Sequence, residues 1–141
     1  MTGTDPQVAA ERVLCSLVTG LSRQIGDHVR ERAAVLGLTA AQAIALRELT
    51  GPMTMSELAE RMSCEPSNAT FVIDKLERQG LLERHPHPTD RRAKQLVRTE
   101  AGTELRERLL ELLVQDSPLG GLSPQEQAVL HALLDRAVTR R

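Results

Sequence analysis

The segment from Met55 to Gly102 constrains the fold of this 141-residue chain more than any other stretch. Apolar residues recur at helical spacing before and after Pro66, which suits the first position of a helix because its missing N–H costs no hydrogen bond there. Gly80 supplies the stop signal for this second helix. Two short helices joined by a tight turn are therefore predicted. The buried stripe of the second is expected to be Ala69, Val72, Ile73 and Leu76.

A two-stranded ribbon is predicted directly after these helices. Leu81–His85 and Ala93–Val97 have the composition of short strands. Between them, Pro86, Pro88 and Asp90 favour a turn over any helix, because proline restricts the backbone and aspartate bonds to its own turn. The segment therefore predicts a helix, a turn, a helix and a hairpin, in that order.

Helices are predicted on both sides of this segment. A long one is expected over 7–36, where apolar residues recur at steps of three and four. Capping boxes predict further helix starts at Thr39, Thr54 and Ser123, since each hydroxyl residue is followed three positions later by Gln or Glu. Another helix is expected from Thr99 to Val114. The fold class is therefore mainly α, with one β hairpin.

The amino-acid composition narrows the class of protein. Apolar residues make up 40% of the chain, but Phe71 is the only aromatic, so the core must be aliphatic. No apolar run approaches the roughly 18 residues that cross a bilayer, and the start of the chain lacks the pattern of a signal peptide. Two cysteines are too few for a disulfide framework. We therefore expect a cytoplasmic protein with no membrane partner.

Charge is distributed unevenly along the chain. The formal net charge is −1, which by itself argues against a nucleic-acid partner. Between Leu81 and Arg98, however, five cations stand against two acids, a local charge of +3. Local positive charge neutralises phosphates, whereas the overall charge mainly affects solubility and nonspecific binding. The segment is therefore suited to contact double-stranded DNA.

The second helix of the predicted pair carries short polar side chains where a DNA-reading helix needs them. In a helix-turn-helix, the first turns of the second helix enter the major groove, which requires short polar side chains at the base edges. Ser67, Asn68 and Thr70 occupy these turns. Lys75 and Arg78 lie further along, where they would reach phosphates. An ordinary solvated helix face is the alternative interpretation.

The predicted ribbon has a basic tip, formed by Asp90, Arg91, Arg92 and Lys94. We expect Asp90 to hold one arginine by a bidentate pair, while the other arginine extends toward a neighbouring minor groove. A hairpin with solvated charges is the alternative. The adjacent helix-turn-helix favours the DNA contact.

Two motifs here resemble those of the MarR family of winged-helix regulators. DKLERQGLLER (residues 74–84) runs from the second helix into the first strand. PTDRRAKQLVRTEAG (residues 88–102) resembles the family's D-x-R wing tip, strand and Thr-x-x-Gly helix start, with Asp90 and Arg92 at the signature positions. Arg98 departs from the pattern, because the family usually has an apolar residue there. This strand end is therefore expected to be more exposed.

The resemblance implies a fold and an activity for the whole chain. Residues 1–141 would form one subunit, with a winged helix-turn-helix over 39–99 and dimerisation helices over 7–36 and 100–141. It would be a homodimeric, sequence-specific repressor on a pseudo-palindromic operator, released by a small ligand, with aromatic or phenolic compounds as the expected class. A thiol-based oxidant sensor of the same fold is one alternative. A winged-helix protein–protein interaction module, favoured by the low net charge, is another.

Few residues bear on the signal that would be sensed. His28 and Arg32 lie one helical turn apart, where they could meet a ligand carboxylate or form a surface or intersubunit contact. Cys15 resembles by position the peroxide-sensing cysteine of one branch of the family. That branch supplies tyrosines, which this chain lacks, so a buried small hydrophobe is the expected role. Cys64, in the turn before the second helix of the pair, is expected to be structural, although its oxidation would disturb DNA contact directly.

No motif indicates catalysis or a cofactor. His85 and His87 share one face of an extended segment, but two ligands without a third do not favour zinc. Their alternative role is to add positive charge to the ribbon at low pH. A nucleophile–base pair, a glycine-rich phosphate loop and paired carboxylates are not evident in the sequence. We therefore predict a protein that is not an enzyme and has no cofactor or metal.

Overall fold

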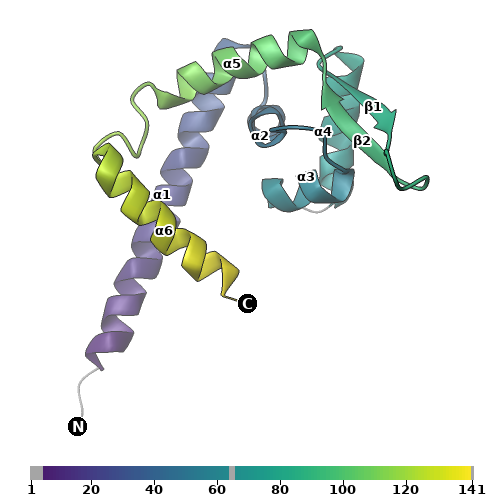
Figure 1. Ribbon diagram of the computed structural model, residues 1–141. Helices are drawn as coiled ribbons and strands as arrows, with labels where there is room; N and C mark the ends of the chain where they lie inside the picture. Colours follow the sequence, from purple (N-terminus) through teal and green to yellow (C-terminus); the bar gives the residue numbers. More distant parts are fainter. Residues whose placement is uncertain (1–4, 64–65, 141) are drawn as a thin grey trace. The chain divides into compact units, whose positions relative to one another are not determined.

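The computed structural model describes residues 5–63 and 66–140. Within these ranges the chain forms six helices and one antiparallel hairpin (Figure 1). The elements are α1 (Pro6–Val35), α2 (Ala40–Glu48), α3 (Met55–Met62), α4 (Pro66–Arg78), β1 (Leu82–Pro86), β2 (Lys94–Arg98), α5 (Glu100–Val114) and α6 (Pro124–Thr139). The mainly α prediction is confirmed. Both strands begin and end one residue later than predicted.

The chain divides into two compact units, Gly26–Leu113 and a second that combines Met1–Ile25 with Val114–Arg141. The described core of the first unit contains no aromatic side chain, as the scarcity of aromatic residues predicts. α2, α3 and α4 contact one another, α4 packs on β1, and α3 packs on β2. Their largest fully buried side chains are Leu46, Leu49, Leu58, Ile73, Leu76, Leu82 and Leu96, joined by Leu109 of α5. Val72, predicted to be in the buried stripe of α4, is only partly buried.

The predicted capping boxes are all present. Thr39, Thr54 and Ser123 each accept a hydrogen bond from the third backbone N–H of the helix, and the Gln or Glu side chain there accepts one in return. Gly80 follows α4 with a φ of +75°, a left-handed conformation that favours glycine. These helix ends are therefore determined by local hydrogen bonds and backbone preferences.

The start of α5 is locked onto the connection between α4 and β1. The Thr99 hydroxyl donates to the Gly80 carbonyl oxygen at 2.7 Å and accepts from the Gly102 N–H at 3.0 Å. A Cβ atom on Gly102 would lie 1.9 Å from the carbonyl oxygen of Leu81. Only glycine therefore allows this close approach, which is the structural reason for the Thr-x-x-Gly motif.

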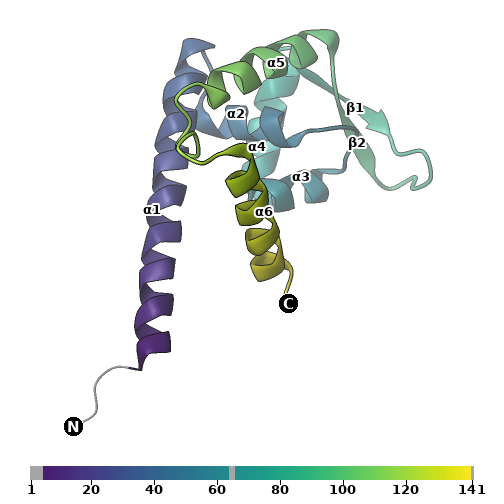
Figure 2. The same cartoon turned by 60° about the vertical axis from the view of Figure 1, so that its left-hand side comes forward.

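The hairpin formed by β1 and β2 extends away from helices α2, α3 and α4 of its unit (Figure 2). The register pairs Leu82 with Arg98 at one end and Pro86 with Lys94 at the other. Met53, just before α3, adds an isolated bridge to Leu96, with backbone N···O distances of 2.8 and 3.3 Å. The hairpin is thus tied at its base to the start of α3, while its tip projects.

The strand end at Arg98 is not more exposed than its neighbours, so the expectation drawn from its departure from the family pattern is wrong. The Arg98 guanidinium is partly buried and donates to the Leu49 carbonyl oxygen and, at 3.3 Å, to the Thr103 hydroxyl. Burial, followed by the positive charge of Arg106, lowers the pKa of Arg98 from its usual value. This cation therefore holds the base of the hairpin to α2 and α5.

The second unit consists of the first part of α1 together with α6, and much of its apolar surface is uncovered. In α6 no described residue is buried. Large exposed apolar side chains occur on both helices and at the end of α5: Val8, Val13, Leu14, Leu17, Val18, Val114, Val129, Leu133, Leu134 and Val138. Over the described part of the chain, no helix has the length and apolar character needed to cross a membrane.

Candidate nucleic-acid interface

One face of α4 is anchored and the other is exposed. Ala69, Ile73 and Leu76 are fully buried against the rest of their unit. Around the helix from them, Ser67 and Asn68 are exposed at the N-terminal end. The buried stripe therefore determines which side chains α4 presents outward, and the predicted polar residues are among them. Thr70, Lys75 and Arg78 are exposed as well.

Phe71 is an exposed residue on the outward face of α4 that the sequence reasoning did not single out. Its side chain is 71% exposed, although it is the only aromatic residue of the chain. Helical spacing could have found it, because residue 71 lies four positions after Ser67 and four before Lys75, and therefore on the same stripe. An apolar ring thus stands between the polar start of the helix and its cations.

The tip of the hairpin is ordered by bonds to its backbone. The Nδ1 atom of His87 accepts hydrogen bonds from the backbone N–H groups of Thr89, at 3.2 Å, and Asp90, at 3.0 Å. A carboxylate oxygen of Asp90 accepts from the Arg92 N–H at 2.9 Å. The predicted bidentate pair between Asp90 and an arginine is therefore wrong. The carboxylate instead closes the turn, a common use of aspartate two residues before an N–H.

The two histidines of the hairpin have different partners. His85 Nε2 lies 2.8 Å from a carboxylate oxygen of Glu83. His87 accepts from two N–H groups, which requires an Nδ1 atom without a proton. The His87 ring therefore helps to order the backbone of the turn. A group of three or more potential metal ligands does not occur among the described residues.

The structure separates the cations of this region into bound and free groups. Arg84 lies 2.5 Å from a carboxylate oxygen of Asp74 and 3.6 Å from one of Glu77, so it links β1 to α4. Arg84 and Arg98 are therefore both engaged in contacts within the fold. The remaining cations are exposed and pair with no acid that the structure describes. They are Lys75, Arg78, Arg91, Arg92 and Lys94.

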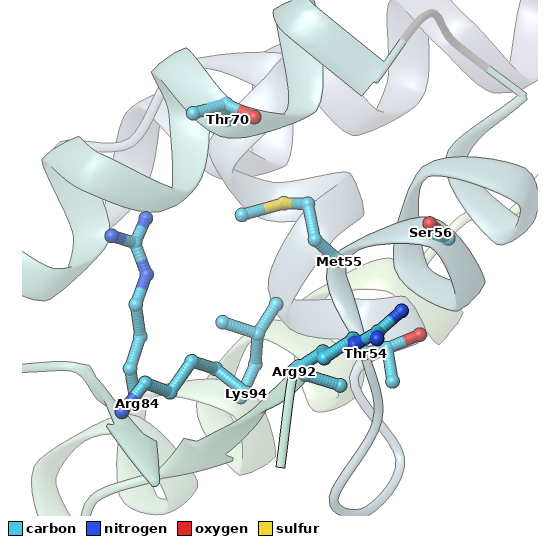
Figure 3. A pocket seen from close by; sticks show the side chains of 9 residues that line it. Thr54, Met55, Ser56, Thr70, Arg84, Arg92 and Lys94 are labelled. Carbon is cyan, nitrogen blue, oxygen red and sulfur yellow. The ribbon is translucent and has the colours of Figure 1, made fainter. Parts of the chain in front are cut away.

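The surface between α4 and the hairpin is concave (Figure 3). A pocket of about 480 Å³ is lined by the start of α3, by α4 and by both strands. In the close view Thr70 lies across from Met55, and Arg84 points from the hairpin toward α4. Three predicted contact residues, Thr70, Arg92 and Lys94, are therefore brought to one basic hollow.

The residues predicted to sense a signal are not brought together in this way. His28 Nε2 lies 2.8 Å from the carbonyl oxygen of Leu113, a contact to the backbone of α5. Arg32 is partly buried one turn further along α1. Cys15, expected to be buried, is exposed in the single chain. Cys64 lies outside the described residues.

Comparisons with known proteins agree with this architecture. The MarR family model matches residues 38–94. The transcriptional repressor MdtR of Bacillus subtilis is 36% identical over 84 residues, which are 58% of this chain and 54% of MdtR. An uncharacterized HTH-type transcriptional regulator of Mycobacterium bovis is 32% identical over 105 residues, 74% of this chain and 71% of the relative. The chain spans little more than half the length of the Bacillus relatives that it matches.

A solved structure extends the likeness over nearly the whole chain. A mutant of MarR from E. coli in which serine replaces a cysteine, crystallised with operator DNA, is 26% identical and superposes with a TM-score of 0.71. The match covers 95% of this chain and 99% of that one. The chain therefore belongs to the MarR family of helix-turn-helix transcriptional regulators.

Proposed function

We propose that this chain is a sequence-specific DNA-binding repressor that acts as a homodimer. The observation that carries the proposal is the joint surface of α4 and the hairpin, where short polar side chains adjoin five exposed cations without described acid partners. The DNA complex of the MarR mutant supports a role in binding DNA. The name of MdtR, a transcriptional repressor, supports the direction of regulation.

In this proposal the two parts of the surface have different tasks. The start of α4 enters the major groove, where Asn68 can bond an adenine edge through both polar atoms of its amide. Lys75 and Arg78 neutralise phosphates beside it. Arg91 and Arg92 extend from the hairpin toward the next minor groove, held in place by the turn that Asp90 closes. Phosphate contacts give affinity and base contacts give sequence preference.

The uncovered apolar surface supports a homodimer. Of the twelve large exposed apolar side chains among the described residues, ten belong to the unit formed by the first part of α1 and by α6. Extensive apolar surface on a helical unit usually marks a protein interface. A two-fold dimer would carry two copies of α4, and this symmetry requires an operator with two inverted half-sites.

A mobility-shift experiment tests the proposal directly. The full chain is mixed with duplex DNA from the region upstream of its own gene, with a scrambled duplex as competitor, and a genomic binding selection covers other sites. We expect a discrete complex that the scrambled duplex does not displace, and a dimer in sedimentation. If neither the upstream duplex nor any selected duplex is preferred, the protein–protein interaction alternative replaces this function.

The same experiment includes the proposed release by a signal. We expect a small aromatic or phenolic acid to dissociate the complex. The oxidant-sensing alternative is favoured by the exposure of Cys15. It requires that a hydroperoxide dissociates the wild-type complex, that a thiol restores it, and that Cys15→Ser abolishes the response while leaving DNA binding intact.

A further inference from the structure

The exposure of the Phe71 side chain does not contribute to the stability of the fold. Its neighbours Ala69 and Ile73 on α4 are fully buried, whereas the Phe71 side chain is 71% exposed. Burying an aromatic ring is among the most favourable contributions that a side chain can make to folding, and this ring contributes little of it. The ring is therefore available to a partner outside the single chain.

The surroundings of Phe71 indicate the kind of partner. Within Gly26–Leu113, the only other large exposed apolar side chain among the described residues is Val35 of α1. The stripe of α4 that carries Phe71 is otherwise polar and basic, with Ser67 and Asn68 one turn before the ring and Lys75 one turn after it. A protein partner would require a continuous apolar patch. A single ring among polar and cationic groups is instead complementary to a polar, anionic partner surface that carries one apolar group.

The major groove of DNA presents such an apolar group. The C5-methyl group of thymine is the apolar group that a base pair presents there, among hydrogen-bond donors and acceptors. A phenyl ring can neither donate nor accept a conventional hydrogen bond. It would therefore be favoured against this methyl group, and it would leave the amino group of a cytosine without a partner.

We propose that Phe71 is a specificity-determining residue that recognises a thymine C5-methyl group in each half-site. The inference rests on the proposed function, because it requires that α4 enters the major groove. It adds a base and a chemical group that the polar residues alone do not specify. Phe71 lies three residues after Asn68, so the recognised thymine is expected close to the base that Asn68 contacts.

Replacing thymine by uracil in the DNA tests the proposal, because this exchange removes only the methyl group. Each thymine of the bound duplex is replaced in turn, symmetrically in both half-sites, and the affinity is measured by fluorescence anisotropy. For the wild-type chain we expect one position at which uracil weakens binding about fourfold per methyl group, hence roughly fifteenfold for two half-sites. The Phe71→Ala variant should respond less than about twofold there.

Two controls separate the possible results. Asn68→Ala alters a neighbouring polar contact and should retain the uracil sensitivity, and circular dichroism verifies that both variants are folded. If the wild-type chain binds its operator specifically but no thymine is sensitive to loss of its methyl group, the role of Phe71 is refuted while the proposed function stands. Equal sensitivity in the wild type and in Phe71→Ala refutes it too. Failure of the wild type to prefer any duplex overturns both.

Discussion

Replacing Arg92 should change how strongly DNA binding depends on salt. Arg92 is exposed at the hairpin and has no acid partner among the described residues, and its backbone N–H is held by Asp90. A cation that approaches the minor groove also lies near the phosphates on either side of it. It releases a counterion there, so its contribution appears in the slope of log affinity against log salt concentration. Arg92→Gln removes the charge and keeps the backbone bond.

The size of the effect follows from the number of free cations. Five per subunit give at most about ten phosphate contacts in a dimer and a slope of about −9. Arg92→Gln removes two contacts per dimer, which makes the slope shallower by about 1.8. Between 50 and 200 mM salt, the ratio of wild-type to variant affinity should therefore fall by about twelvefold.

Fluorescence anisotropy with the bound duplex, titrated at several salt concentrations, measures this slope. Arg30→Gln is a matched control, because Arg30 is an exposed arginine on α1 whose guanidinium lies 2.9 Å from a carboxylate oxygen of Asp27. We expect its slope to equal that of the wild type. An unchanged slope in Arg92→Gln, or an equal change in Arg30→Gln, would show that the tip of the hairpin does not contact phosphates.

Three further substitutions test other parts of the structure. Gly102→Ala should lower the free energy of unfolding by about 1–3 kcal/mol in urea denaturation, because the added methyl group meets a backbone oxygen; Gly51→Ala, which has open space, should change it by less than about 1 kcal/mol. Asn68→Ala should reduce the ratio of operator to scrambled-duplex affinity, and an equal loss for both duplexes would show that Asn68 reads no base. Asp90→Asn keeps an oxygen that can accept from the Arg92 N–H, so it should retain more operator affinity than Asp90→Ala; equal losses would show that the carboxylate charge matters more than the turn.

Features that depend on neighbours within a few residues could be predicted from the amino-acid sequence alone. The capping boxes at Thr39, Thr54 and Ser123 appear as predicted, because their hydrogen bonds join residues three positions apart. Pro88 and Asp90 lie in the turn between the strands, as predicted, whereas Pro86 is the last residue of β1 and pairs with Lys94. The spacing of apolar residues along α4 also identified Ala69, Ile73 and Leu76 as its buried face. These features depend on local geometry, which is determined by residues that are close together in the sequence.

Which charged side chains form ion pairs, and which apolar side chains are exposed, depends on the folded arrangement of the chain. Arg84 and Arg98 look like the other hairpin cations in the sequence, but their partners are Asp74 on α4 and the Leu49 carbonyl oxygen at the end of α2. The exposures of Cys15 and Phe71 likewise depend on what packs beside them. Burial and ion pairing are determined by groups distant in sequence, and composition and periodicity do not specify where those groups lie. Of the five cations in the segment from Leu81 to Arg98, three therefore remain available to a partner. Two further cations on α4 are available as well.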